Sequence, residues 1–139
     1  MNISSLIERV RKAKRVYIIG NGGSGANCGH ICNDLESVGI RTYVMNEATK
    51  SAWENDYAHA DVFARWIELH GEPGDLLIAL SGSGKSLNIL NACAAAERIG
   101  MEVHREFGAV QGFDMQASEE RQIWIGHELM RGLRARSPV

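Results

Sequence analysis

Two glycine-rich segments, each directly after an apolar run, constrain the fold of this chain more than any other feature. Residues 20–25 (GNGGSG) follow the apolar run 15–19, and residues 81–86 (SGSGKS) follow the run 75–80. Short apolar runs that end in glycine are typical of buried strands. A glycine loop between a strand and a helix exposes backbone N–H groups at the positive end of the helix dipole. The two segments therefore predict two anion-binding loops on a sheet.

The rest of the chain alternates between strand-like and helix-like patterns. Apolar residues at helical spacing, helix caps and glycine stops predict helices over residues 5–14, 26–38, 53–69, 87–99 and 117–136, and strands over 15–19, 40–45, 75–80 and 101–107. This alternation predicts βαβ units and a three-layer α/β fold of the flavodoxin-like or Rossmann-like kind, with a parallel sheet of four to five strands flanked by helices. A length of 139 residues fits one domain, residues 1–139. Residues 108–116 show no regular pattern.

Composition excludes several classes of function. The formal net charge is −2, so no electrostatic footprint for nucleic acid or an anionic membrane is present. Apolar runs such as residues 76–80 are too short to span a membrane, and residues 1–14 lack the apolar segment of a signal peptide. The 3 cysteines form no CxxC pair, which argues against a disulfide framework. We expect a cytoplasmic protein without nucleic-acid or membrane partners.

Two nucleotide-binding hypotheses each account for one loop. Residues 20–25 match the dinucleotide pattern GxGxxG, and Glu47 lies just beyond the second predicted strand. Residues 79–86 nearly match the P-loop pattern GxxxxGK[ST], but Ala79 replaces its first glycine and no later strand ends in Asp. Since neither hypothesis explains both loops, we expect no nucleotide cofactor.

A third hypothesis explains the two loops together. Ser81, Ser83 and Ser86 present hydroxyls beside backbone donors, which suits a phosphate monoester. The Asn/Gly loop beside them can hold the remainder of a small polar ligand. This pattern predicts a small polar molecule with a phosphate monoester as the ligand.

Four blocks of the chain resemble the sugar isomerase (SIS) domain family and, within it, its phosphoheptose isomerase branch. The blocks are GNGGS at 20–24 with His30 and Asp34, NDY at 55–57 with VFAR at 62–65, the serine loop within 74–88, and IWIGHEL at 123–129. The resemblance implies an aldose–ketose isomerase that converts sedoheptulose 7-phosphate to a heptose 7-phosphate through an enediol. It also implies a homo-oligomer, a dimer or a tetramer, with sites between subunits.

The resemblance assigns roles to individual residues. Asp34 is the implied base and His127 the implied acid/base, and zinc is the implied metal. The implied metal ligands are His30, Asp34, Glu119 and His127, and the implied substrate contacts are Asn21, Gly22, Gly23, Ser24, Asn55, Asp56, Ser81, Gly82, Ser83, Ser86 and Glu119. Independently of the family, the i, i+4 spacing of His30 and Asp34 places both on one helix face, where they can share a metal.

The chain also departs from the family pattern. The family has Glu at the position of Asp34, Gln at Glu119 and Thr at Gly82. Its long helix before the first strand is short here, and a loop and strand before the last helix are reduced. These departures favour an alternative, a non-catalytic SIS protein that binds a phosphosugar or another protein as a regulator, whereas His127 favours the enzyme.

The remaining notable side chains are interpreted as structural. We expect ordinary surface or core roles for His59, His70 and His104. Buried positions are expected for Cys28, Cys32, Trp66 and Trp124.

Overall fold

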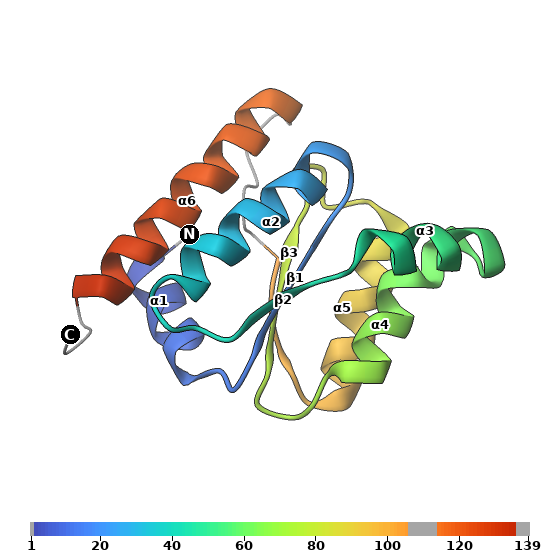
Figure 1. Cartoon of the computed structure of the whole chain (residues 1–139), viewed down its shortest axis with the longest axis horizontal. Helices are drawn as coiled ribbons and strands as arrows, with labels where there is room; N and C mark the ends of the chain where they lie inside the picture. Colours follow the sequence, from blue (N-terminus) through green and yellow to red (C-terminus); the bar gives the residue numbers. More distant parts are fainter. Residues whose placement is uncertain (1, 106–113, 136–139) are drawn as a thin grey trace.

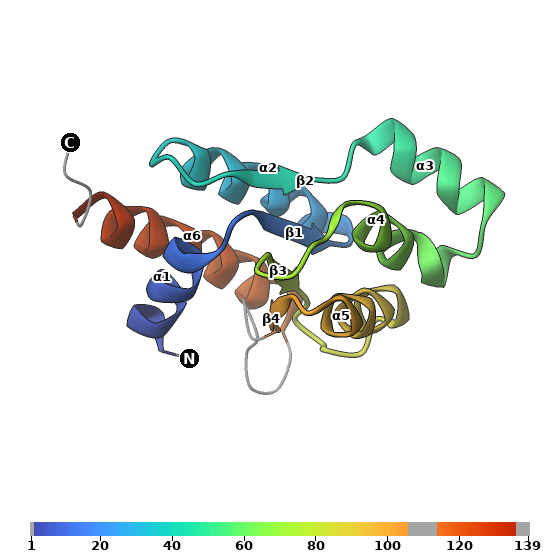
Figure 2. The same cartoon turned by 90° about the horizontal axis from the view of Figure 1, so that it is seen from below.

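The computed structural model describes residues 2–105 and 114–135 and shows a parallel sheet between two layers of helices (Figures 1 and 2). In chain order its elements are α1 (Ile3–Lys12), β1 (Val16–Gly20), α2 (Gly22–Glu36), β2 (Thr42–Val44), α3 (Glu47–Asp56), the 3₁₀ turn η1 (His59–Asp61), α4 (Val62–His70), β3 (Leu76–Leu80), α5 (Leu87–Ile99), β4 (Glu102–His104) and α6 (Met115–Ala135). The strand order is β2-β1-β3-β4, and every pairing is parallel. The predicted three-layer α/β fold is confirmed.

The two central strands are buried along their whole length, as parallel strands covered on both faces must be. Their side chains alternate between two apolar cores. In β1, Val16 and Ile18 pack with α1, α2 and α6, whereas Tyr17 and Ile19 pack with α4 and α5. Helices therefore cover both faces of the sheet, and its strand ends are left for the loops (Figure 2).

The segment predicted as one helix over residues 53–69 is three elements in the structure. Asn46 caps α3 by accepting hydrogen bonds from the backbone N–H groups of Ala48 and Thr49, so this helix begins before the predicted start. Tyr57, with φ −127° and ψ 179°, is extended and ends it. The prediction missed the start of α3 because this helix has no buried residue and hence no apolar stripe.

Other boundaries also differ from expectation. Helix α1 spans Ile3–Lys12 rather than residues 5–14, and β2 spans Thr42–Val44 rather than residues 40–45. Helix α2 begins at Gly22 rather than at residue 26, because the glycines of the first loop form its first turn. Helix α6 begins at Met115, where Asp114 Oδ1 accepts a hydrogen bond from Ala117 N. Strand β4 is short, and the part of the predicted strand and loop at residues 106–113 lies outside the described residues.

Burial follows the predictions for Cys28, Cys32 and Trp66, but the prediction for Trp124 is wrong. Trp124 is 50% exposed, with the Arg121 guanidinium 5.8 Å from the centre of its ring. Helix α6 packs inward through Ile125 and Leu129, which are fully buried, and Trp124 projects from a different side of the helix. Across residues 2–105 and 114–135, none of the helices is both long enough and apolar enough to cross a membrane.

Candidate functional site

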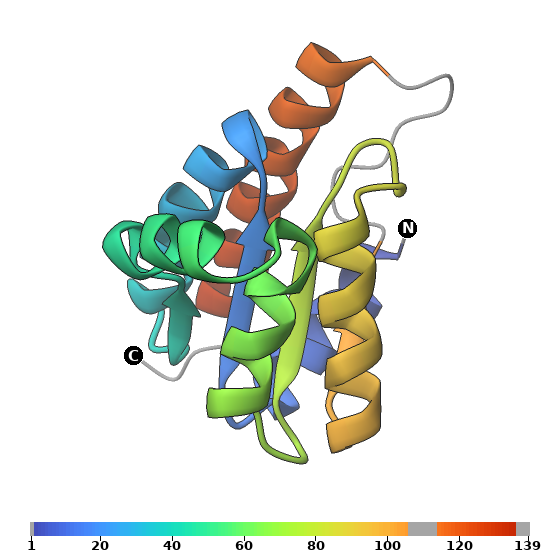
Figure 3. The same cartoon turned by 90° about the vertical axis from the view of Figure 1, so that its right-hand side faces the viewer.

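A cleft of about 210 Å³ lies beyond the carboxyl ends of β1 and β3, where ligands bind in open parallel sheets. The start of α2, the loop after β3 and the start of α6 come together there (Figure 3). The lining residues are Asn21, Gly22, Gly23, Ser24, Leu80, Ser81, Gly82, Ser83, Ser86, Met115, Ser118 and Glu119. The structure thus brings together both glycine-rich loops and Glu119.

Three helices begin at this cleft; Asp114 caps α6, but α2 and α5 are not capped by a side chain. Asn21 precedes α2 and Ser86 precedes α5, and among the described residues neither makes a side-chain cap hydrogen bond. By contrast, Asn2 and Asn46 cap α1 and α3, which begin elsewhere. The first-turn N–H groups of α2 and α5 and the positive ends of their dipoles are therefore available to an anion.

The serine loop is held in shape by its own hydroxyl groups. Gly84 N donates to Ser81 Oγ at 3.0 Å, and Lys85 N donates to Ser83 Oγ at 3.2 Å. Gly84 has φ +67°, a left-handed conformation that favours glycine. Because both hydroxyl oxygens accept from the backbone, their hydrogens remain to be donated to a ligand.

The first loop is packed closely against its neighbours. A Cβ at Gly20 would lie 2.9 Å from the backbone of Ser24, and a side chain at Gly23 would overlap the Glu119 carboxylate. Asn21 forms a reciprocal amide pair with Asn88, with N···O distances of 3.0 and 2.8 Å. Glycine is therefore required where Gly20 approaches the Ser24 backbone, whereas a side chain at Gly23 would displace the Glu119 carboxylate.

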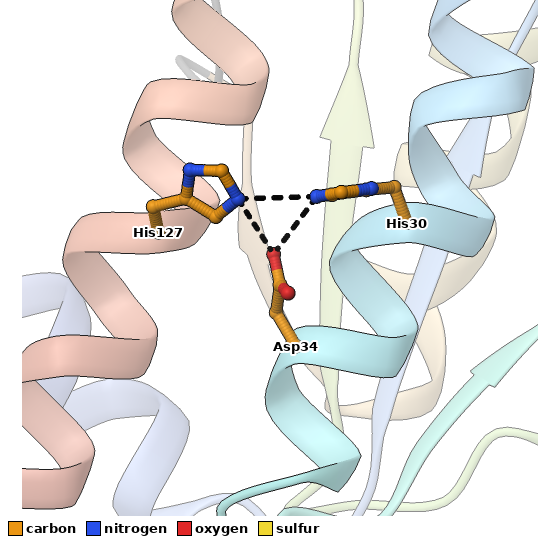
Figure 4. Close-up of side chains that lie close together, drawn as sticks. All are labelled: His30, Asp34 and His127. Atoms are coloured by element: carbon orange, nitrogen blue, oxygen red, sulfur yellow. Dashed lines mark hydrogen bonds and ion pairs between the residues drawn. The ribbon is translucent and has the colours of Figure 1, made fainter.

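About two helical turns beyond the cleft residues Ser24 and Glu119, three side chains from α2 and α6 point at one another (Figure 4). None of these three side chains lines the cleft. His30 Nε2 lies 3.1 Å from His127 Nε2, and Asp34 Oδ2 lies 3.5 Å from His30 Nε2 and 3.6 Å from His127 Nε2. Asp34 is 6% exposed, and within the described part of the chain its Oδ2 makes no hydrogen bond.

This triad has the geometry of a metal site. Ligand atoms at 2.0–2.1 Å from a tetrahedral zinc ion would be separated by about 3.3 Å. The three observed distances, 3.1, 3.5 and 3.6 Å, scatter around that value. Two imidazoles and one carboxylate are ligand types that zinc accepts, and three protein ligands leave a fourth position for substrate or water. The predicted pairing of His30 with Asp34 on one helix face agrees with this geometry.

Three predicted site residues are placed differently from expectation. Glu119 lies in the cleft but not in the triad, and Asn55 and Asp56 lie in neither. Among the residues described, the group that could hold a metal comprises His30, Asp34 and His127, without Glu119, which lines the cleft opposite Gly23. Asn55 and Asp56 are exposed at the end of α3 and do not line this cleft. Their roles as substrate contacts stay predictions.

Two buried amides near the cleft were not predicted. Asn88 is 3% exposed in α5, and Gln122 is fully buried in α6. Each occupies a position on the inward stripe of its helix, beside apolar residues such as Ile89 and Ile125. A polar residue within an apolar stripe was the available signal.

The fold and the cleft define a class, an α/β domain in which two glycine-rich loops and two uncapped helix N-termini line a cleft suited to an anion. Within that class the chain belongs to the SIS domain family, whose model matches residues 2–104. The matched part contains both loops, His30 and Asp34, whereas α6 with His127 lies outside it.

Curated relatives of the chain are phosphoheptose isomerases, and two of them show the extent of the match. The enzyme from Rhodospirillum rubrum is 37% identical over 111 residues, which cover 74% of this chain and 59% of the relative. The enzyme from Crocosphaera subtropica is 36% identical over 107 residues, covering 71% of this chain and 55% of the relative. The chain thus spans between half and two thirds of the length of these relatives.

Solved structures share the fold. A phosphoheptose isomerase from Neisseria gonorrhoeae superposes with a TM-score of 0.80 at 22% identity, over 96% of this chain and 83% of that chain. The Vibrio vulnificus NanR protein, solved in complex with ManNAc-6P, superposes with a TM-score of 0.73 at 18% identity, over 98% of this chain and 55% of that chain. The common fold therefore includes the region of α6.

Proposed function

We propose that the protein is an aldose–ketose isomerase of a sugar phosphate and that its substrate is sedoheptulose 7-phosphate. The observation that carries the proposal is the triad of His30, Asp34 and His127, which lies on α2 and α6, the two helices whose N-terminal ends line a cleft suited to an anion. The curated relatives named phosphoheptose isomerase support the substrate.

The phosphate would bind at the N-terminus of α5. Ser81, Ser83 and Ser86 line the cleft there, and the helix dipole favours a negative charge. The sugar would extend along the first loop, residues 21–24, with Glu119 as an acceptor for its hydroxyl groups. This arrangement would place the reacting carbons toward the triad.

Isomerisation moves a proton between adjacent carbons through an enediol, so it needs a base and an acid. Asp34 Oδ2 is buried and makes no hydrogen bond to the described residues, which suits acceptance of a proton from carbon. His127 Nε2 lies 3.6 Å from it and can exchange protons with the sugar oxygens. A zinc ion held by His30, Asp34 and His127 would polarise the substrate carbonyl. It would take one Asp34 oxygen and leave the other for the carbon proton. Because it would also occupy His127 Nε2, proton exchange at that nitrogen belongs to the site without the ion.

A non-catalytic regulator is the second candidate. It is favoured by the fold shared with the NanR protein, which was solved with a phosphosugar. Such a protein needs the anion cleft but has no use for three ligand atoms that converge between α2 and α6. The triad is therefore the feature that separates the two functions.

The assay is aldose formation from sedoheptulose 7-phosphate by the purified protein, with and without a chelator. The variant is His127→Ala, and the matched control is His70→Ala, an exposed histidine at the end of α4. Turnover lost in His127→Ala and retained in His70→Ala supports the isomerase, and loss with the chelator supports the metal. Tight binding of the sugar phosphate without turnover would contradict the isomerase and support the regulator.

We also propose that the protein, a single SIS domain over residues 1–139, is a homo-oligomer. The side chain of His30 is 48% exposed and Trp124 is 50% exposed, so the outer side of α2 and α6 leaves the triad open. A second copy packed there would shield the site. Sedimentation at micromolar concentration checks this, and a monomer would contradict it.

A further inference from the structure

A chain of buried hydrogen bonds links α6 to the first loop of the cleft. Gln122 is 0% exposed, and its Nε2 donates to Ser24 Oγ at 2.9 Å. Its Oε1 accepts from Asn27 Nδ2 at 2.9 Å, and the same Asn27 nitrogen donates to the backbone carbonyl of Glu119 at 3.1 Å. The helix that carries His127 is thus tied to a residue that lines the cleft.

The direction of every bond in this chain is set by one group. The Glu119 carbonyl can only accept, so the Asn27 atom beside it must be the amide nitrogen. Gln122 must then present its oxygen to Asn27 and its nitrogen to Ser24. Ser24 Oγ is consequently an acceptor in this contact.

A hydroxyl that accepts one hydrogen bond still has its own hydrogen to donate. Among the described residues, Ser24 Oγ donates to no acceptor, and Ser24 lines the cleft. The adjacent Glu119 carboxylate, packed against Gly23, offers only acceptor atoms. The cleft therefore presents a donor and an acceptor side by side on neighbouring elements.

We infer that Gln122 is a positioning residue that fixes the Ser24 hydroxyl as a hydrogen-bond donor into the cleft, where it binds an acceptor oxygen of the ligand. The identity of that ligand, a sugar phosphate, rests on the proposed function. Because the direction of the hydrogen bond from Gln122 to Ser24 is set before the ligand binds, the Ser24 hydroxyl does not have to reorient when the ligand enters. Gln122 contacts no substrate itself and acts through Ser24.

The test reverses the direction of the hydrogen bond between residue 122 and Ser24 with little change in the shape of the side chain. In Gln122→Glu the carboxylate still accepts from Asn27 but now also accepts the Ser24 hydrogen, which withdraws the donor from the cleft. Gln122→Met removes the donor to Ser24 without adding a charge and covers the case in which a buried carboxylate impairs folding. Leu129→Met is the matched control, because Leu129 is equally buried on the same helix.

The readouts are the affinities for sedoheptulose 7-phosphate and for inorganic phosphate by calorimetry, and the KM and kcat of turnover. We expect Gln122→Glu to weaken binding about tenfold and to raise KM with little change in kcat, as loss of one buried hydrogen bond would. In a Ser24→Ala background, the same substitution should have no further effect. If the affinity for both ligands falls, the acceptor oxygen belongs to the phosphate. If only the affinity for the sugar phosphate falls, the acceptor oxygen belongs to the sugar.

Two results would overturn the inference. One is unchanged affinity in both Gln122→Glu and Gln122→Met, and the other is an equal loss with and without Ser24, which would leave Gln122 a merely structural role. If neither sedoheptulose 7-phosphate nor inorganic phosphate bound the unmodified protein, the inference would also be overturned. Absence of turnover with binding retained would contradict the isomerase alone, so the two failures are distinguishable.

Discussion

The two helical layers that flank the sheet differ in what they bury. The layer of α4 and α5 packs Phe63, Ile67 and other apolar residues against the sheet. The layer of α2 and α6 also has an apolar core, but it buries Asp34 and Gln122 as well. Buried polar groups are costly unless they are partnered. Among the described residues, the layer of α4 and α5 buries one such group, Asn88, whereas the layer of α2 and α6 buries Asp34 next to His30 and His127. The proposed proton transfer therefore belongs to the second layer, and the first mainly supports the fold.

Two hollows in the surface reinforce this contrast. A groove of about 690 Å³ beside β2 is lined by aromatic residues such as Tyr43, Trp53 and Trp66. The cleft between the glycine loops has only about 210 Å³, yet two uncapped helix N-termini open onto it. Convergent donors, rather than volume, distinguish the candidate site.

The largest expected effect is on the α2 and α6 layer. Replacing Asp34 by Asn should lower kcat by about 10²–10⁴-fold, since it removes the proposed base. It should also weaken zinc binding, measured by equilibrium dialysis. The control is Glu36→Gln on the exposed side of the same helix. Equal activity of the two variants would contradict the role of Asp34.

A substitution in the other layer should act on stability instead. Phe63 is 2% exposed, so Phe63→Ala should lower the free energy of unfolding by about 3–5 kcal/mol. Denaturant unfolding measures this change. The kcat of the folded fraction should stay within a few-fold of the parent at low temperature. A collapse of kcat without a loss of stability would break the division between the layers.

An intermediate effect is expected in the serine loop. Ser83→Ala removes a hydroxyl that lines the cleft, so KM for the sugar phosphate should rise about tenfold with little change in kcat. Steady-state kinetics provides the measurement, and Ser51→Ala, exposed on α3, is the control. An unchanged KM would argue against phosphate binding at this loop.

The smallest effect concerns Cys28 in the core of the α2 layer. Burial raises the pKa of this thiol from 9.0 to about 12, so folding favours its neutral form. The contribution of the neutral thiol to the free energy of unfolding is fully present below pH 9 and declines as the pH rises toward 12. Between pH 9 and 10 we expect a loss of about 1 kcal/mol that is absent in Cys28→Ala, measured by urea unfolding. If the free energy of unfolding changed with pH in the same way in the parent and in Cys28→Ala, this assignment to Cys28 would be contradicted.

The sequence predicted the sheet better than the outer helices, for a physical reason. Strands β1 and β3 are continuous apolar runs bounded by turn residues, and the predicted bounds fall within one residue of the observed ones. Helix α3 lacks a buried residue, so no apolar stripe marked its first half. Trp124 was misplaced because its apolar character could not show which side of α6 faces inward.

The candidate site was also predictable only in part from the sequence. Helical spacing alone paired His30 with Asp34, because i, i+4 residues share a face. The approach of His127 depends on the packing of α6 against α2, which no local pattern encodes and which only the family resemblance suggested. The direction of the Gln122 hydrogen bonds needed the positions of Asn27 and the Glu119 carbonyl, which are set by tertiary structure.

Proton exchange at carbon is the most direct test of the central claim that the triad of His30, Asp34 and His127 moves a proton on a sugar phosphate. The protein is incubated with sedoheptulose 7-phosphate in D₂O, and deuterium in the sugar is followed by NMR. An enediol route predicts deuterium at C2 of the aldose product, dependent on Asp34 and His127. Bound substrate that gains no deuterium at any carbon would contradict the isomerase.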